Sequence, residues 1–522
     1  MNEEGRDIFL YDTTLRDGCQ AEGMTLSAED KLEITERLDE LGVHYVEGGF
    51  AGANPKDDQY FREVQDLDLR NVRIAAFGAT RRKGRKPEDD AGLQALLRAE
   101  TPVVTIVAKA WDYHVTEVLH TDLEENLRMV DDSVRFLKET GREVLVDAEH
   151  WFDGYEDDPD YAMKVARVAA EAGADCVVLC DTNGGALTDR VGELTARAVE
   201  EIDCPVGIHC HNDCGLAVAN TIASVQHGAV HVQGTLNGFG ERAGNADLCA
   251  IIPIINLKTP HRCVSDEQLK KLTEVSRFAY EAANLMFDEH QPFVGPSAFA
   301  HKAGQHVDAM RKAEAACEHI DPELVGNERR FLLSELSGHA GMLAKLEDYS
   351  IESDRETASL LLDRLKELEN EGYQYEAAEA SFELLATRIT GNFVPRFDVK
   401  SYHVSCIRQP DGALVTDATV KLDVNGDQMH TASEGDGPVN ALDGALRKAL
   451  EPHYPELARM RLTDYRVRVI NPRAATAARV RVVIQSTDGK RVWGTVGVSE
   501  NIIDASWEAL KDSVEYMLLM SE

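Results

Sequence analysis

The sequence of 522 residues lacks any apolar run long enough to cross a membrane. A spanning helix needs about 18 or more consecutive apolar residues, and charged side chains interrupt every hydrophobic stretch of this chain well before that length. The opening residues, MNEEGRDIFL, are acidic and do not have the basic and then apolar layout of a signal peptide. Both absences predict a cytoplasmic protein that does not bind a membrane.

Positive charge is also scarce. The chain has 55 Lys and Arg residues against 92 Asp and Glu residues, which gives a formal net charge of −37. Nucleic acids and anionic membrane surfaces would be repelled, so we expect neither as a partner. The ten cysteines include no CxxC pair, which is typical of reduced thiols and not of a disulfide framework.

The first 250 residues alternate short apolar runs with stretches of helical spacing, such as SAEDKLEITERLDELG. The predicted strands are IFLYDTTL, HYVEGGF, VRIAAFGA, PVVTIVAKA, EVLVDAEH, CVVLCDT, PVGIHCH and VHVQGTL. Eight strands in this rhythm predict an α/β protein with a (β/α)₈ TIM barrel over residues 1–280. An open, doubly wound sheet is the alternative.

The rest of the chain has a different pattern. Residues 281–394 are charged and mostly helical, and we expect them to form a connecting region that contributes to the active site. Residues 395–522 contain three strands and a helix, followed by the same order again. This internal duplication predicts a C-terminal α+β regulatory and dimerisation domain of two βββα units.

Polar side chains gather where the predicted barrel strands end. Reactive groups of (β/α)₈ barrels lie at the C-terminal ends of the strands and in the loops that follow them. The sequence places seven candidate residues there: Arg16, Asp17, Glu149, Thr182, His209, His211 and Asn245. This convergence indicates one functional site at the mouth of the barrel.

The candidate metal ligands are Asp17, His209 and His211. The two histidines stand one residue apart on a predicted strand, so their side chains point to the same face. A histidine pair on a strand more often packs or forms hydrogen bonds, but with Asp17 it offers one hard oxygen and two imidazoles. That set suits Zn²⁺, Mn²⁺, Fe²⁺ or Co²⁺ and does not exclude Mg²⁺, and Asn245 could add a carbonyl oxygen.

An open position on such a metal can chelate a 2-oxo acid through its keto and carboxylate oxygens. Arg16 could stabilise the alkoxide that develops on the keto oxygen; its alternative is a salt bridge to an acid such as Glu241. Glu149 and Thr182 could bind a carboxylate and position the substrate or a water molecule. Their alternative is to cap loops.

Three segments, YDTTLRDGCQAEG, HCHNDCGLAVAN and NGFGERAGNADL, resemble in order and spacing the signature segments of one metal-dependent barrel family. The family comprises 2-isopropylmalate synthase, homocitrate synthase, citramalate synthase and 3-hydroxy-3-methylglutaryl-CoA lyase. Other segments are most similar to the citramalate synthase branch: VEGGFAGANPKDDQYF, FGATRRKG, DAEHWFDGY, FVGPSAFAHKAGQHVDA and IDPELVGNERRFLLSELSG. The resemblance covers essentially the whole chain. Cys19, Phe50 and Cys317 depart from it, because the family often carries Thr, Trp and Tyr there.

The resemblance implies an acyltransferase that condenses acetyl-CoA with pyruvate in a Claisen-type reaction and then hydrolyses the thioester. The products would be (R)-citramalate and CoA, in isoleucine biosynthesis. Asp17, His209 and His211 match the metal ligands of the family, and Asn245 matches an additional ligand nearby. The metal is left open between Mn, Mg, Zn and Co.

The resemblance also assigns roles to other residues. Arg16 matches the arginine that polarises the keto group, while Glu149 and Thr182 match substrate-contacting positions. His306 and Asp308 match the pair tied to deprotonation of the acetyl group. In the family that histidine reaches the barrel mouth of the partner subunit, which implies a homodimer with shared active sites. The C-terminal domain implies allosteric regulation by an amino acid, expected to be isoleucine.

Three rival functions follow from the same residues. The nearest is 2-isopropylmalate synthase, which takes 2-oxoisovalerate, because a pocket distinguishes two methyl groups by only a few kcal/mol. A carbon–carbon lyase is less favoured, since a simple lyase barrel needs no duplicated C-terminal domain. A non-catalytic amino-acid sensor would show damage in the ligand set, and the sequence shows none.

Overall fold

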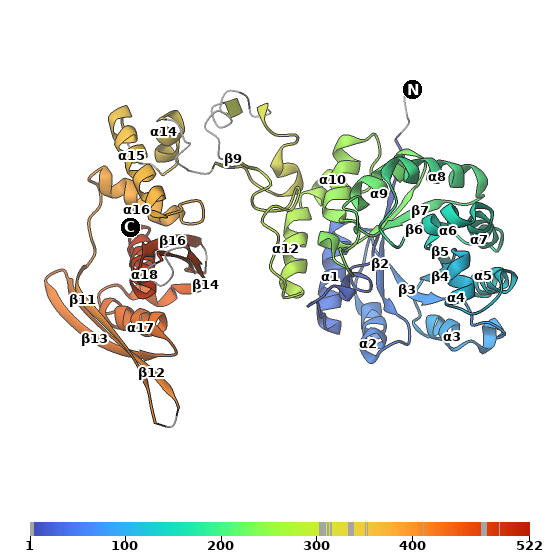
Figure 1. Ribbon diagram of the computed structural model, residues 1–522, viewed down its shortest axis with the longest axis horizontal. Helices are drawn as coiled ribbons and strands as arrows, with labels where there is room; N and C mark the ends of the chain where they lie inside the picture. Colours follow the sequence, from blue (N-terminus) through green and yellow to red (C-terminus); the bar gives the residue numbers. More distant parts are fainter. Residues whose placement is uncertain are drawn as a thin grey trace. The chain divides into compact units, whose positions relative to one another are not determined.

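The computed structural model describes residues 5–301, 309–310, 313, 316–331, 339–349, 351, 353–410, 412–470, 478–489 and 491–521 (Figure 1). The chain forms two compact units. The first comprises Met1–Phe299 and His319–Arg329, and the second comprises Ala300–Glu318 and Arg330–Glu522. Among the described residues, no helix combines the length and the apolar character that a bilayer crossing requires.

The first unit is built around a closed barrel of eight parallel strands. In chain order the strands are β1 (Phe9–Asp12), β2 (Tyr45–Phe50), β3 (Arg73–Ala79), β4 (Val103–Lys109), β5 (Glu143–Glu149), β6 (Cys176–Asp181), β7 (Val206–Cys210) and β8 (His231–Gly234). Strand β8 pairs in parallel with β1, with Phe9 opposite His231. The predicted barrel is therefore confirmed, and the open sheet is excluded.

Helices cover the outside of this barrel (Figure 1). They are α1 (Ala28–Leu41), α2 (Pro55–Glu63), α3 (Ala91–Arg98), α4 (Asp112–Glu117), α5 (Leu123–Glu139), α6 (Trp151–Asp157), α7 (Pro159–Glu171), α8 (Thr188–Glu201), α9 (Ala217–Gln226), α10 (Leu248–Lys258), α11 (Asp266–Leu269) and α12 (Leu272–Ala282). Helix α1 begins at a capping box formed by Ser27 and Asp30, and it ends at Gly42 with φ 85°. A left-handed residue at that position satisfies the last carbonyls, and glycine adopts it without strain.

A buried ion pair fixes the turn that follows β2. Lys31 is 2% exposed, and its Nζ lies 2.6 Å from Asp57 Oδ1 and donates to the carbonyl of Gly48 at 2.9 Å. The other carboxylate oxygen of Asp57 accepts from the backbone N–H of Phe50 at 3.1 Å. The pair thus joins α1, the end of β2 and α2, and it sets the position of Phe50.

We expect Asp57→Asn to lower the free energy of unfolding by about 3 kcal/mol, because breaking one half of a buried pair leaves the Lys31 ammonium uncompensated. Chemical denaturation of the two proteins measures the difference. Asp58→Asn is the matched control, because among the described residues the Asp58 carboxylate accepts only from an exposed backbone N–H, that of Gly52. Equal losses in both variants would contradict a role for the buried charge.

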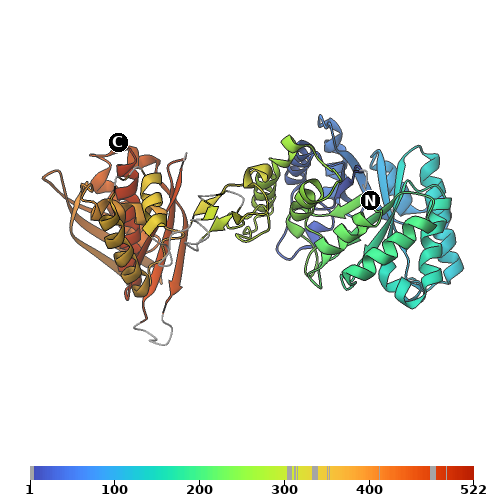
Figure 2. The ribbon, with the colours of Figure 1, turned by 90° about the horizontal axis from the view of Figure 1, so that it is seen from above.

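The second unit contains the duplicated C-terminal pattern (Figure 2). Its helices α14 (His339–Asp348), α15 (Arg355–Glu371) and α16 (Glu379–Ile389) precede two repeats. The first repeat is β11 (Asp398–Arg408), β12 (Leu414–Val424), β13 (Asp427–Gly435) and α17 (Pro438–Leu450), and the second is β14 (Arg461–Val469), β15 (Val480–Thr487), β16 (Val492–Ser499) and α18 (Ile502–Leu519). Each repeat has a three-stranded antiparallel sheet in the order of the chain.

The two repeats also share a local irregularity. The register shifts between Val399 and Ser401 in the first strand of one repeat, and between Leu462 and Asp464 in the first strand of the other. The two predicted βββα units are confirmed. The predicted domain boundaries at residues 280 and 394 stay a prediction.

Candidate active site

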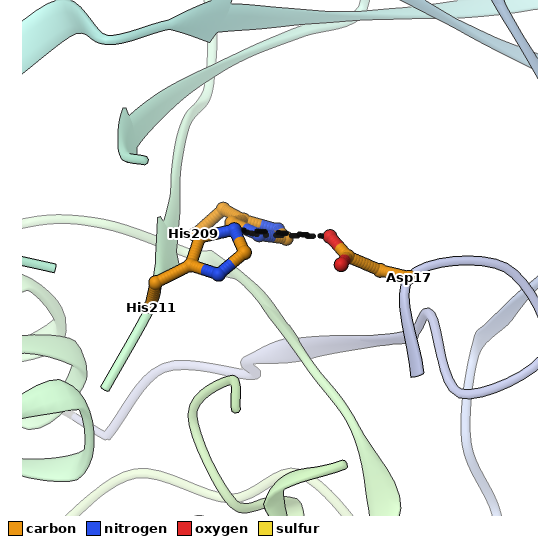
Figure 3. A group of neighbouring side chains, drawn as sticks. All are labelled: Asp17, His209 and His211. Carbon is orange, nitrogen blue, oxygen red and sulfur yellow. Dashed lines mark hydrogen bonds and ion pairs between the residues drawn. The ribbon is translucent and has the colours of Figure 1, made fainter. Parts of the chain in front are cut away.

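The structure brings Asp17, His209 and His211 together (Figure 3). His209 lies on β7, His211 follows the end of that strand, and Asp17 lies in the loop after β1. Asp17 Oδ2 is 3.5 Å from His209 Nε2 and 3.9 Å from His211 Nε2. The two Nε2 atoms are 3.3 Å apart, and all three side chains are buried.

Within the described residues, several polar atoms of this cluster have no hydrogen-bond partner. Asp17 Oδ1 and Asn245 Oδ1 are buried and unpaired among the described residues. The Asn245 amide donates from Nδ2 to the carbonyl of Phe239 at 3.1 Å, which fixes its orientation and leaves Oδ1 free. Buried polar atoms are rarely unsatisfied. Unpaired oxygens beside two converging imidazole nitrogens are the donor set that a divalent cation satisfies, so these residues fit a metal ion.

The ionisation states of the cluster suit metal binding. Burial alone would raise the pKa of Asp17, but the Arg16 guanidinium and the two imidazoles lower it to about 2. Burial, followed by the repulsion of His209, lowers the pKa of His211 to about 4. At neutral pH the cluster therefore presents a carboxylate and a neutral His211 imidazole, which are the forms that coordinate metals.

A chain of buried hydrogen bonds orients His209. Its Nδ1 lies 2.8 Å from Gln233 Oε1 on β8, and Gln233 Nε2 donates to Asp147 Oδ1 on β5 at 2.9 Å. Gln233 is fully buried. Because the amide nitrogen is used by Asp147, its oxygen faces His209 and requires a proton on Nδ1. The lone pair of His209 Nε2 then faces Asp17 and His211, as in many metal-binding histidines.

Glu47 holds Arg16 beside the cluster of candidate metal ligands. Arg16 Nε donates to Glu47 Oε2 at 2.6 Å, and Nη1 lies 3.2 Å from Asp17 Oδ2. The guanidinium carbon lies 4.0 Å from the centre of the Phe77 ring. Among the described residues none accepts a hydrogen bond from Arg16 Nη2, so those donors are available to a ligand. The alternative partner Glu241 instead contacts Arg242.

Glu47 is a residue of this site that was not predicted from the sequence. This carboxylate is fully buried, and it accepts hydrogen bonds from Tyr11 Oη and Thr13 Oγ1 as well as from Arg16. The signal was present, because Glu47 is the one acid inside the apolar strand HYVEGGF. An acid inside such a strand needs partners within the barrel.

A cavity of about 310 Å³ opens beside these groups. Six of the predicted residues line it: Arg16, Asp17, Glu149, Thr182, His209 and His211. Phe50, Phe77 and Val107 give the cavity an apolar wall, and the rings of Phe50 and Phe77 are edge-to-face at 5.6 Å. The rest of the lining is Gln20, Asp147, Cys180, Glu241 and Arg242. Phe50 is one of the three departures from the family pattern, and the structure places it in the cavity lining. Phe77 and Val107 were not predicted, because in the sequence their apolar side chains are indistinguishable from barrel core.

The substrate-contacting candidates keep free hydrogen-bonding capacity. Thr182 Oγ1 accepts from the backbone N–H of His150 at 2.9 Å, which leaves its hydroxyl proton to donate to a ligand. Glu149 forms an ion pair with Lys109 at the neighbouring strand end. His306 and Asp308 lie outside the described residues.

Comparisons with known proteins agree with this architecture. Residues 7–279 match the HMGL-like family model. Residues 293–373 match the homocitrate synthase post-HMGL domain-like model, and residues 376–518 match the LeuA allosteric (dimerisation) domain.

Full-length relatives are more specific. An (R)-citramalate synthase of Aquifex aeolicus is 51% identical over 519 residues, covering 99% of this chain and 98% of the relative. That of Geobacter sulfurreducens is 51% identical over 518 residues, with the same coverage of 99% and 98%. A probable 2-isopropylmalate synthase of Methanopyrus kandleri is 33% identical over 505 residues, covering 96% of each. The chain therefore belongs to the HMGL-like family and, within it, to the (R)-citramalate synthases.

Proposed function

We propose that this protein is an acyltransferase that condenses acetyl-CoA with pyruvate and hydrolyses the resulting thioester to (R)-citramalate and CoA, in isoleucine biosynthesis. The main observation in support of this proposal is the buried cluster of Asp17, His209 and His211, which lines one cavity together with Arg16. The identity of 51% to proteins named (R)-citramalate synthase supports the choice of reaction.

We assign the metal site to Asp17, His209 and His211, with Asn245 Oδ1 as the additional oxygen nearby. When bound, a divalent cation would supply a Lewis acid for the keto oxygen of the 2-oxo acid. Mn, Mg, Zn and Co are all candidates. The two imidazoles favour the softer ions, and the oxygens of Asp17 and Asn245 also suit Mg²⁺ and Mn²⁺.

Arg16 stabilises the negative charge that develops on the keto oxygen during carbon–carbon bond formation. Its guanidinium is fixed in advance by Glu47 and Asp17, so little reorganisation is needed when the charge appears. The free hydroxyl proton of Thr182 donates to the substrate carboxylate, and Glu149 positions the substrate or the hydrolytic water. Phe50 and Phe77 give the cavity an apolar surface that suits the methyl group of pyruvate.

The acetyl methyl group is a weak carbon acid, so a base must remove a proton as the thioester enolate forms. We assign this role to His306, paired with Asp308, because an imidazole titrates near neutral pH. By family resemblance the histidine comes from the partner subunit, and the match of residues 376–518 to a dimerisation domain supports a homodimer with shared sites.

The same C-terminal domain is the proposed site of an amino-acid effector, expected to be isoleucine, the end product of the route. An effector there would change the affinity of the barrel for a substrate, and the coupling would be reciprocal. Inhibition of the full-length protein by isoleucine and not by leucine is the expected result.

A thiol-release assay with acetyl-CoA tests the proposed reaction. The panel is pyruvate, glyoxylate, 2-oxobutyrate, 2-oxoisovalerate and 2-oxoglutarate, each with and without added divalent metal. We expect the highest kcat/KM with pyruvate and release of (R)-citramalate. A preference for 2-oxoisovalerate would reassign the protein as a 2-isopropylmalate synthase.

The Gln233 contact gives a prediction about metal affinity. We expect Gln233→Leu to weaken metal binding by about 10- to 100-fold, because His209 loses the acceptor that fixes its tautomer. Calorimetric titration of the metal-free protein measures this directly. Gln94→Leu on α3 is the control, and its affinity should equal that of the unaltered protein; equal metal affinity in Gln233→Leu would contradict the orienting role.

A further inference from the structure

A cluster of cations stands out in this acidic chain. Residues 81–86, Arg-Arg-Lys-Gly-Arg-Lys, hold five basic side chains in six positions, whereas the whole protein carries a net charge of −37. We call these six residues the basic loop. It follows the C-terminal end of β3, and Phe77 of that strand lines the cavity. The loop therefore leaves the barrel at the mouth that carries the candidate active site.

The first residue of the basic loop is an anchor. Arg81 is 4% exposed, and its guanidinium pairs with Glu125 and with Asp132, each at 2.8 Å. Its backbone N–H donates to Ser133 Oγ at 2.9 Å. Three side chains of α5 thus fix the position at which the loop begins.

Further contacts hold the middle of the loop. The backbone N–H of Gly84 donates to Glu125 Oε1 at 3.0 Å, and that of Arg82 donates to Asp90 Oδ2 at 3.0 Å. Lys83 Nζ donates to the carbonyl of His120 at 2.6 Å. A loop fixed in this way loses little conformational entropy when a ligand binds.

The guanidinium groups of Arg82 and Arg85 take no part in the contacts that hold the basic loop. Both are exposed, and neither side chain forms a hydrogen bond or an ion pair with another residue in the described part of the chain. The remaining lysine, Lys86, has an acid 4.0 Å away, Glu88. Two free guanidiniums on a rigid loop are repelled by their basic neighbours, and a bound anion would relieve that repulsion.

The loop is within reach of the cavity. Arg82 stands five positions after Phe77, and five steps along the chain span at most about 18 Å even when fully extended. A cosubstrate with its reactive end in the cavity and its charged end at Arg82 would need a flexible arm of that order. The pantetheine arm of CoA joins a thioester to a nucleotide in this way.

We infer that the basic loop binds the anionic nucleotide end of the thioester cosubstrate, with Arg82 and Arg85 contacting the phosphates of its adenosine 3′-phosphate 5′-diphosphate. This inference rests on the proposed function, which brings acetyl-CoA to the cavity. A chain with so many acids repels a polyanion, and a local cluster of guanidiniums reverses the field where the polyanion must dock. Arginine also matches phosphate oxygens with paired donors.

The test uses the full-length double variant Arg82→Gln/Arg85→Gln. We expect KM for acetyl-CoA to rise about tenfold, while kcat and KM for pyruvate stay unchanged. With S-acetylpantetheine, which lacks the nucleotide, the variant and the unaltered protein should give equal kcat/KM. Rising salt should reduce kcat/KM for acetyl-CoA more steeply in the unaltered protein, because the variant has fewer phosphate contacts to screen.

Arg98→Gln is the matched control. Arg98 is exposed in the last turn of α3, so it belongs to the same βα unit but lies at the helix end that leads to the start of β4. The KM of the Arg98→Gln protein for acetyl-CoA should equal that of the unaltered protein. An unchanged KM in the double variant, or an equal loss with S-acetylpantetheine, would overturn the inference.

A binding measurement separates this inference from the proposed function. Calorimetric titration with CoA and with adenosine 3′,5′-bisphosphate requires no turnover. Weaker binding of both by about tenfold in the double variant supports the basic loop as a nucleotide site, even if thiol release proves absent. Equal affinities in the double variant and the unaltered protein overturn it, even if thiol release is observed.

Discussion

His209→Ala is expected to abolish metal binding and turnover together. The substitution removes one of three clustered ligands, and it leaves Gln233 Oε1 without the donor that it meets at 2.8 Å. Losing Lewis-acid stabilisation costs several kcal/mol in the transition state. We expect kcat/KM with pyruvate to fall by at least about a thousandfold, which corresponds to about 4 kcal/mol.

The control for this variant is His227→Ala. His227 is exposed at the end of α9, and its ring contacts the Ala223 carbonyl. The His227→Ala protein should retain full metal affinity and activity. Circular dichroism and thermal unfolding of both variants show whether the barrel is intact. A folded His209→Ala protein that still binds metal with unaltered affinity would contradict the assignment of this ligand.

Arg16→Lys should separate the chemistry from metal binding. Lysine keeps the positive charge, so the buried Glu47 carboxylate is not left without a cation. A single ammonium cannot keep the contacts to Glu47 and Asp17 and also present a planar pair of donors to the substrate. Removing one donor aimed at a developing oxyanion typically costs 10²- to 10³-fold, so we expect kcat to fall about a hundredfold.

The same variant should bind metal within a few-fold of the unaltered affinity, because Asp17, His209 and His211 are all kept. Steady-state kinetics gives kcat and KM for pyruvate, and calorimetry gives the metal affinity. Arg142→Lys is a control in the first unit, since within the described part of the chain that arginine donates only to the backbone carbonyls of Thr101 and Leu97. Unchanged kcat in Arg16→Lys would remove Arg16 from the catalytic groups.

The barrel and the place of its site could be predicted from the sequence because both depend on local patterns. Eight apolar runs separated by helical spacing leave few ways to bury every strand, and a closed parallel sheet puts all strand ends at one mouth. His209, His211 and Asp17 then converge although almost two hundred residues separate Asp17 from the histidines. The duplicated C-terminal units follow from the same kind of pattern.

The partners of these residues could not be predicted, because they depend on which side chains point into the barrel together. Glu47 of β2 reaches Arg16 in the loop after β1, and Gln233 of β8 reaches Asp147 of β5, only after the sheet closes. In the sequence nothing near any of them indicates its partner, because the groups that they contact lie on or beside other strands. The Arg82 and Arg85 side chains have no ion-pair partner in the described part of the chain, because the neighbouring acids contact other groups. In the fold those acids pair with Arg81 or accept from backbone N–H groups.

The most direct test of the central claim is anomalous diffraction from crystals of the full-length protein grown with Mn²⁺. We predict one strong anomalous peak between Asp17 and the Nε2 atoms of His209 and His211, and the loss of that peak in His209→Ala crystals. A strong peak at another place in the barrel, with none at these three residues, would contradict the proposed metal site and the function built on it.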